Sequence, residues 1–298
     1  MEPITLPFSL VDVFAREPLS GNGLSVFLLD NDLPTLAMQR ITQEMRQFET
    51  IFLRRMEGTA RFHARIFTME EELPFAGHPV IGAAALLHVE FFSAEPVAHI
   101  ELVTALKSIP VTSRREGGIY SAQMDQGVAV FGTPIPRAGI DAFLKALNLV
   151  SSDLAPDLPL QVVSTGLPYL IVPIRANLEG ARIVVRDFEA MLAGVGAKFV
   201  YLLDVERREA RNWDNDGRIE DIATGSAAGP AAAYLVRHNL ARPGENILLS
   251  QGRFLNRPSE IHAMVRGSSE LSVTVRGEVC FVGKGTLKVP ASSSPGKT

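Results

Sequence analysis

The chain has 298 residues, of which 46% are hydrophobic and 21% charged, a composition typical of a soluble globular protein with one or two domains. A net charge of −4 argues against a nucleic-acid-binding surface, which requires clustered positive charge. The single cysteine, Cys280, permits no intrachain disulfide, and no segment approaches the roughly 20 apolar residues that span a bilayer, so we expect a cytoplasmic protein without a membrane partner.

The first half of the chain is predicted to contain several strands and two helices. The helix at 34–48 has Pro34 near its first position and apolar residues at helical spacing. A second, strongly apolar helix covers 80–89. Strands are predicted at 8–14, 24–29, 49–53, 61–68, 100–102, 108–112 and 120–124.

The second half is predicted to follow a similar order. Its helices are expected at 187–195 and 227–236. Its strands are expected at 165–172, 199–203, 247–249, 260–265, 271–276 and 280–282.

One segment occurs twice in the chain. Residues 72–87 align with residues 220–235 in a constant register, in which Gly77 is opposite Gly225. The spacing is almost half of the chain, which indicates two related units rather than a solenoid. Both helices in the repeat are apolar on nearly every side and must therefore be buried.

We therefore predict an α+β fold with two pseudo-repeated halves, each a curled, mostly antiparallel sheet around a central apolar helix. The N-terminal half is expected to cover 1–128 and to be completed by a returning strand near 278–290. The C-terminal half is expected at 129–277, followed by a disordered tail at 291–298. The N-termini of the two central helices are expected to share a cleft, where their N–H groups and dipoles would favour an anion.

Three polar residues near the predicted helix starts are candidates for chemistry. Glu49 is either an exposed carboxylate at a strand edge or a carboxylate in an apolar site whose pKa is raised by desolvation. His78 follows Gly77 directly and could cap the helix or act in catalysis; its counterpart Ser226 favours a shared structural role. Asp221 could complement the helix dipole, bind a substrate hydroxyl or amine, or hold a neighbouring histidine in orientation.

Several other motifs do not support a cofactor or a metal. Residues 282–286 resemble part of a phosphate loop but lack the upstream glycine and the following helix, so we interpret them as a turn between strands. The six histidines show no metal-ligand spacing, and no nucleophile elbow occurs. We predict no cofactor and no metal.

The chain resembles the phenazine-biosynthesis PhzF-like family of isomerases, which shares its fold with diaminopimelate epimerase. The motifs that carry the resemblance run over nearly the whole chain, at 11–14, 21–22, 48–50, 65–68, 74–79, 124–126, 220–221, 223–230, 251–252 and 257–259. In the epimerases the two Gly blocks carry catalytic cysteines, whereas the matching places here are Ala76 and Thr224. The chain therefore resembles the epimerases in its fold but not in its catalytic groups.

The resemblance implies a cofactor-free proton shift in a small carboxylated ring substrate, and a homodimeric enzyme. A glutamate at the place of Glu49 would remove and redeliver the proton, and residues matching His78 and Asp221 would assist. The residues expected to bind the substrate are Gly77, Thr224, Gly225 and Ser226. Three departures from the family pattern affect the substrate, namely Phe48, the segment 69–71 and the shortened segment 211–217.

Two alternatives to this isomerase remain open. An amino-acid racemase or epimerase would need two bases on opposite faces of its substrate, and the absence of an acid at Ala76 or Thr224 counts against it. The second alternative is a non-catalytic dimer that binds a small molecule.

Overall fold

The computed structural model describes residues 4–290 and divides into two compact units. Unit 1 comprises the chain up to Met124 together with the part from Gly277 onward, and unit 2 is Asp125–Arg276. The predicted tail at 291–298 lies outside the described residues. Within the described residues, no helix is long and apolar enough to cross a membrane.

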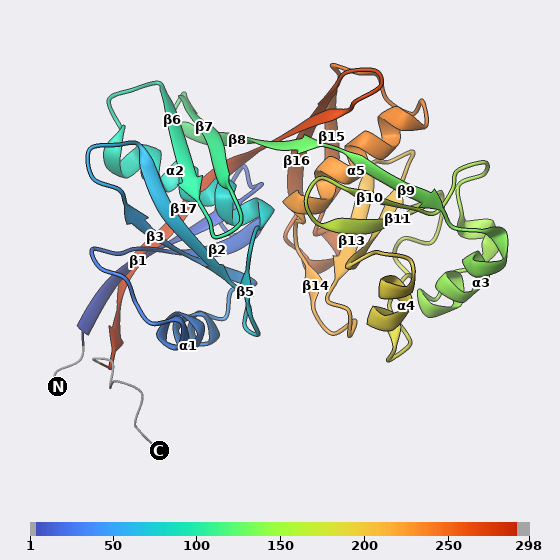
Figure 1. The fold of residues 1–298 in the computed structure, drawn as a ribbon, viewed down its shortest axis with the longest axis horizontal. Helices are drawn as coiled ribbons and strands as arrows, with labels where there is room; N and C mark the ends of the chain where they lie inside the picture. The colour runs from blue at the N-terminus through green and yellow to red at the C-terminus, as the bar shows by residue number, and fades with distance from the viewer. Residues whose placement is uncertain (1–3, 291–298) are drawn as a thin grey trace. The chain divides into compact units, whose positions relative to one another are not determined.

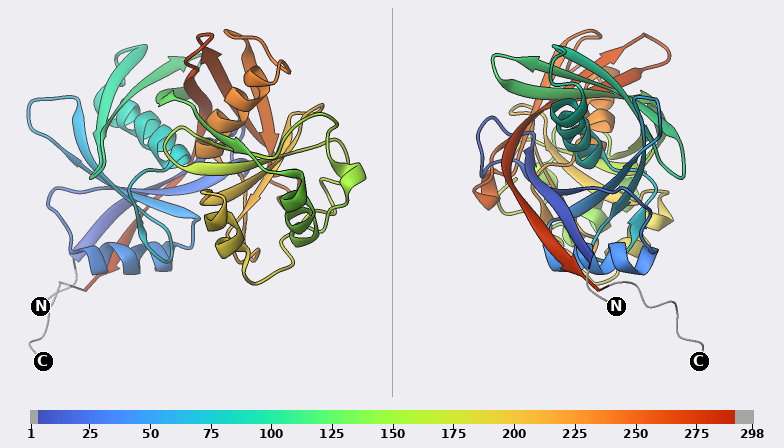
Figure 2. Two further views of the ribbon diagram at one scale, coloured as in Figure 1. Left: turned by 45° about the vertical axis from the view of Figure 1, so that its right-hand side comes forward. Right: turned by 90° about the vertical axis from the view of Figure 1, so that its left-hand side faces the viewer.

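Unit 1 is a curled sheet with one helix inside it and one helix outside it. Its elements are β1 (Ile4–Val13), β2 (Asn22–Leu28), α1 (Thr35–Met45), β3 (Glu49–Arg55), β4 (Arg61–Phe67), β5 (Glu72–Leu73), α2 (Gly77–Phe91), β6 (Val97–Val103), β7 (Ser108–Glu116) and β8 (Ile119–Val128). Neighbouring strands are antiparallel except for β2–β3 and β4–β6, which are connected through α1 and α2. The strands surround α2, as the right-hand view of Figure 2 shows.

Unit 2 repeats this arrangement. Its elements are β9 (Val130–Pro134), α3 (Arg137–Ala146), β10 (Gln161–Ser164), β11 (Pro168–Ile174), α4 (Phe188–Gly194), β12 (Phe199–Asp204), β13 (Glu209–Trp213), β14 (Glu220–Asp221), α5 (Gly225–Arg237), β15 (Asn246–Gln251), β16 (Ser259–Arg266) and the first part of β17 (Ser272–Val289), a strand that belongs to unit 1 from Gly277 onward. The parallel pairs are β11–β12 and β13–β15, connected through α4 and α5 (Figure 1). Helix α5 packs against β10, β11, β12 and β16.

The two units share one order of elements, from β1 to β8 and from β10 to β17. In each unit, the buried helix follows two parallel strands, β2 and β3 or β11 and β12. Between them and the helix come a strand antiparallel to the second of the pair and then a two-residue strand. The predicted α+β fold with two repeated halves is therefore confirmed.

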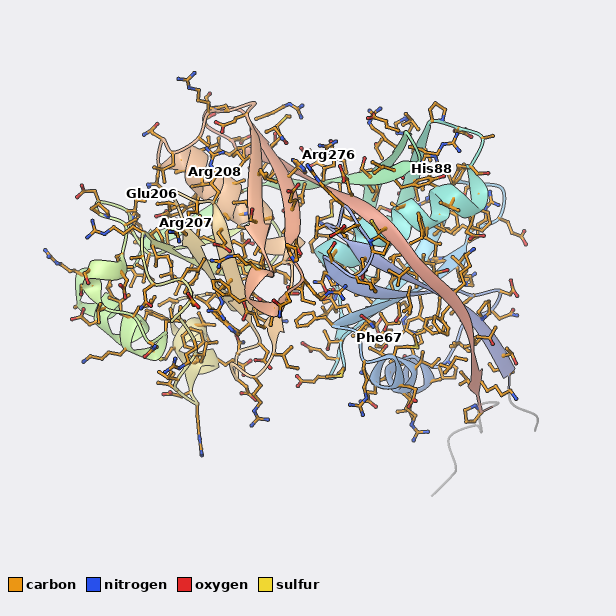
Figure 3. All side chains as sticks on the ribbon, turned by 180° about the vertical axis from the view of Figure 1, so that it is seen from behind. Phe67, His88, Glu206, Arg207, Arg208 and Arg276 are labelled. Atoms are coloured by element: carbon orange, nitrogen blue, oxygen red, sulfur yellow. The ribbon has the colours of Figure 1, made fainter. Side chains whose placement is uncertain are left out.

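A glycine in α2 allows the strands of unit 1 to pack closely against this helix. A Cβ atom on Gly82 of α2 would lie 2.6 Å from Leu24 Cδ2 and 2.8 Å from Val13 Cγ2, closer than packed carbon atoms approach. Outside the sheet, α1 packs Met38 and Ile41 on Phe67, which is labelled in Figure 3 beside that helix.

Two polar side chains in the interiors of the apolar helices, His88 and Tyr234, are hydrogen-bonded within their own units. His88 of α2 is fully buried, and its Nε2 donates to the carbonyl of Glu95 while Nδ1 accepts from Ser113 Oγ (Figure 3). Tyr234 of α5 donates its hydroxyl to the carbonyl of Pro159. Each helix can therefore be buried on all sides without an unpaired side chain at these positions.

The structure differs from the sequence predictions in two places. The strands expected at 271–276 and 280–282 are one strand, β17, and the expected turn at 282–286 lies inside it. There β17 pairs with β1, with a register shift between Leu10 and Val11. The helix α3 and the strands β9, β10 and β13 were not predicted.

Candidate functional site

Glu49 is the first residue of β3 and is only 6% exposed. In the parallel ladder it is opposite Leu24 of β2. Opposed residues on neighbouring strands share a face of the sheet, and Leu24 lies against α2 at Gly82. Glu49 therefore points to the inner face that holds α2, and the expectation of an exposed strand-edge carboxylate is not met.

His78 is the second residue of α2 and lies beside Glu49. Its Nδ1 is 3.2 Å from Glu49 Oε2 and 3.3 Å from Asn22 Nδ2. All three side chains are buried. The sequence suggested no role for Asn22, although it stands in one of the motifs that carry the family resemblance.

The imidazole of His78 is neutral at pH 7 because burial lowers its pKa to about 3. Its Nε2 is buried and has no hydrogen-bond partner within residues 4–290. A buried polar atom without a partner is costly, and such atoms are common where a ligand completes the site.

This lowered pKa predicts a pH dependence of stability. An unfolded histidine titrates near about pH 6.5, so between that pH and about 3 only the unfolded chain binds the proton. Stability is therefore lost as the pH falls through this window, by up to about 1.4 kcal/mol per pH unit. We expect His78→Gln, made in a Glu49→Gln background so that the neighbouring carboxyl group is absent, to flatten the urea-unfolding free energy against pH. Parallel curves for Glu49→Gln and the double variant would show that His78 is not held neutral.

The N-terminus of α2 begins at Gly77, with Ala76 as the N-cap residue. Alanine has no side-chain acceptor, so no side chain caps this helix. The backbone N–H groups of the first turn thus have no side-chain acceptor on their own cap residue.

The matching helix start in unit 2 is α5, which begins at Gly225 with Thr224 as its N-cap residue. The next residue, Ser226, shares a hydrogen bond of 2.7 Å with the hydroxyl of Tyr169. The Thr224 side chain does not cap the helix; its hydroxyl instead donates to Asp221 Oδ2 at 2.6 Å. Asp221 is buried at the end of β14.

Gln251, at the end of β15, holds the turn between Asp221 and Thr224. Its Nε2 donates to the Asp221 carbonyl at 2.7 Å and to Thr224 Oγ1 at 3.0 Å. Its Oε1 accepts from the Thr224 N–H at 3.1 Å and from the hydroxyl of Tyr201 at 3.2 Å. No role for Gln251 was predicted from the sequence, where its only signal was its place in a family motif.

The repeat provides only one carboxylate at the equivalent strand position. In unit 1, Glu49 begins β3 opposite Leu24; in unit 2, Phe199 begins β12 opposite Tyr169. His78 and Ser226 are both the second residues of their helices. The acid and histidine pair is thus confined to unit 1, and unit 2 has an aromatic ring and a hydroxyl in its place.

The structure brings Glu49 together with His78, and Asp221 together with Thr224. Gly77, Gly225 and Ser226 lie at the starts of the two buried helices, as predicted. Among the described residues, no three histidine, cysteine, aspartate or glutamate side chains are grouped so as to hold a metal ion.

Comparison with known proteins gives a consistent result. Residues 11–285 match the model of the family described as phenazine biosynthesis-like protein. A trans-2,3-dihydro-3-hydroxyanthranilate isomerase of Pseudomonas fluorescens is 31% identical over 94% of this chain and 98% of its own length.

Two solved structures share the fold. A predicted epimerase from Pseudomonas aeruginosa is 48% identical, with a TM-score of 0.89, over 96% of this chain and 100% of its own. A PhzF-family phenazine biosynthesis protein from Bacillus anthracis is 22% identical, with a TM-score of 0.82, over 95% of this chain and 99% of its own; at that identity it supports the fold alone.

Proposed function

This chain belongs to the phenazine biosynthesis-like protein family and is an isomerase, and we propose that it moves a proton within a small carboxylated ring substrate without a cofactor. The observation that carries the proposal is the buried contact between Glu49 and His78. A proton shift needs one group that accepts a proton and later returns it, held where water does not compete. Glu49 is that group in our proposal.

The contact between Glu49 and His78 has two proton states that differ by one proton. When Glu49 is ionised, His78 can donate from Nδ1 to Oε2, which leaves Nε2 as an acceptor. When Glu49 takes up the substrate proton, it can hold that proton on its other carboxyl oxygen while Oε2 keeps the hydrogen bond from Nδ1, so the imidazole proton does not move. His78 thus holds the Glu49 carboxyl group in place in both states and remains neutral.

We propose that a buried helix start of this kind binds a polar group of the substrate. A helix N-terminus favours a carboxylate through its N–H groups and its dipole. Gly77, Thr224, Gly225 and Ser226 are the proposed binding residues, and Asp221 is proposed to accept a hydrogen bond from a substrate amine or hydroxyl.

The substrate class follows from the named relative and from the chemistry of the site. A dihydro-hydroxyanthranilate has the carboxylate, the amine and the mobile ring proton that these groups would serve. Phe48, next to Glu49, adds apolar surface and favours a substrate with an apolar ring face. A homodimer and a place in phenazine biosynthesis are part of the same proposal.

The test is turnover in deuterated water. The purified protein is incubated with trans-2,3-dihydro-3-hydroxyanthranilate and with related cyclohexadienyl and aromatic carboxylates, and the products are analysed by mass spectrometry. We expect isomerisation of a cyclohexadienyl carboxylate, with one solvent deuterium in the product, because a carboxyl proton exchanges with water. Binding in a thermal-shift assay without turnover of any compound would favour the non-catalytic alternative.

An amino-acid epimerase is a second candidate, because the 48% identical structure is described as a predicted epimerase. Two-base epimerisation needs an acid on each face of the substrate carbon. Ala76, Thr224 and Phe199 offer no carboxyl or thiol group at the equivalent positions. We therefore expect no change in optical rotation when free L-amino acids are incubated with the protein. Racemisation of an amino acid would favour the epimerase over the isomerase proposed above.

A further inference from the structure

The side-chain amide of Gln251 can adopt only one orientation. Its oxygen faces the Thr224 N–H, which can only donate, and its nitrogen faces the Asp221 carbonyl, which can only accept. A flipped amide would oppose like groups at both contacts. Gln251 is almost completely buried, so water cannot relieve such a conflict.

This orientation decides the direction of the next hydrogen bond. Thr224 Oγ1 already accepts from Gln251 Nε2, and its own single proton is directed to Asp221 Oδ2. The 2.6 Å separation is in the range of about 2.5–2.7 Å that is typical of a hydroxyl bound to an ionised carboxylate. If Oδ2 carried a proton instead, the buried hydroxyl proton of Thr224 would lose this acceptor.

We infer that Thr224 and Gln251 are positioning residues that hold Asp221 ionised and in a fixed orientation as a hydrogen-bond acceptor. The chain of donors runs one way, from Gln251 Nε2 through Thr224 Oγ1 to Asp221 Oδ2, and the hydroxyl of Tyr201 donates to the other end of the Gln251 amide. The inference rests on the proposed function in one respect, namely that Asp221 contacts the substrate.

The first unit has no counterpart to this arrangement. Its N-cap residue is Ala76, which has no hydroxyl group. At the matching place in unit 2, Thr224 has a hydroxyl group whose proton is committed to Asp221.

The test compares Thr224→Val, which has nearly the same shape but no hydroxyl, with Thr224→Ser, which keeps the hydroxyl. The first readout is the carboxyl 13C resonance of Asp221 in the unliganded protein, assigned with Asp221→Asn and followed against pH. We expect its titration midpoint to move upward in Thr224→Val, because a hydrogen bond to the ionised form is lost, and to return in Thr224→Ser. A midpoint that is unchanged in Thr224→Val overturns the inference.

The second readout is kcat/KM for the substrate identified above. Loss of a hydrogen bond to a charged group predicts a decrease of about tenfold to a hundredfold in Thr224→Val and a smaller decrease in Thr224→Ser, which keeps the hydroxyl. Thr42→Val is the matched control, because Thr42 is also fully buried and its hydroxyl donates to the carbonyl of Met38, within α1. It should change neither readout.

The two readouts separate this inference from the proposed function. If wild-type protein converts none of the compounds, the proposed function fails, while the Asp221 titration still decides whether Thr224 controls that carboxylate. If the midpoint moves but kcat/KM is unchanged in Thr224→Val, the positioning role in the reaction is overturned.

Discussion

Replacing Glu49 with glutamine is expected to lower kcat by about 10²–10⁴-fold, the usual contribution of a positioned general acid–base group. Glutamine has the same shape and can keep a hydrogen bond to His78, but it cannot take up and return a proton. No carboxylate stands at the equivalent place in unit 2, where Phe199 begins β12, so the repeat supplies no substitute. Incorporation of solvent deuterium into the product should fall with the rate.

The control for this prediction is Glu49→Asp, which keeps a carboxyl group but withdraws it by one methylene. It should retain more activity than Glu49→Gln, because the group can still exchange a proton. Circular dichroism and thermal melting check that both variants fold, and ligand binding by Glu49→Gln should persist. Full activity in Glu49→Gln would show that another residue accepts and returns the proton.

The sequence was most informative about the two buried helices. Residues 80–89 and 227–236 are apolar on all sides, and a helix of this kind has few places in a soluble protein other than the centre of a sheet. The constant register of the repeat then predicted a second copy of the same arrangement. Helices α2 and α5 occupy those places and extend beyond the predicted ranges.

The sequence was less informative where strand pairing overrides the conformational preference of individual residues. Gly283 and Gly285 favoured a turn, yet both lie in β17. Gly285 is opposite Phe8 of β1, and a Cβ atom there would lie 2.7 Å from the phenyl ring. The glycine therefore makes room for an aromatic side chain on the neighbouring strand, which only the tertiary structure reveals.

The polar contacts of the site could not be derived from spacing. Glu49 and His78 lie together because α2, which carries His78, packs on the sheet in which Glu49 begins β3. Asp221 and Gln251 lie on either side of α5 in the chain, and they meet because β13 and β15 are parallel neighbours. The sequence indicated Glu49, His78 and Asp221 by their place near the predicted helix starts, and Gln251 only as part of a family motif. Their burial and hydrogen bonding are the information that the structure adds.

A second large effect is expected on stability, from Arg211 in β13. Its Nε and Nη2 atoms donate to the two carboxyl oxygens of Glu220 at 2.8 and 2.6 Å. Its Nη1 donates to the carbonyl groups of Leu178, Glu179 and Ala181 at 2.9–3.0 Å. The Arg211 and Glu220 side chains are only 10% and 8% exposed, so water cannot replace these contacts.

Arg211→Met is therefore expected to lower the free energy of unfolding by about 3–5 kcal/mol. The substitution keeps a side chain of similar length, but it removes the guanidinium group that lies over the rings of Trp213 and Phe254, and it leaves the Glu220 carboxylate buried without its partner. Glu220 directly precedes Asp221, the proposed hydrogen-bond acceptor. The substitution would therefore also remove the ion pair that anchors the residue before Asp221. Urea unfolding followed by circular dichroism and by the fluorescence of Trp213, the only tryptophan, measures the change.

The repeat supplies a matched control for this prediction in Arg65 of β4. Arg65 donates to both carboxyl oxygens of Glu72 at 2.7 and 2.6 Å, the same geometry in the first copy of the repeat. Here both side chains are 32% exposed, and an ion pair in contact with water contributes about 0–1 kcal/mol. Arg65→Met should therefore cost less than about 1 kcal/mol. Equal losses in the two variants would show that burial does not set the strength of these pairs, and that unit 2 tolerates an unpaired Glu220.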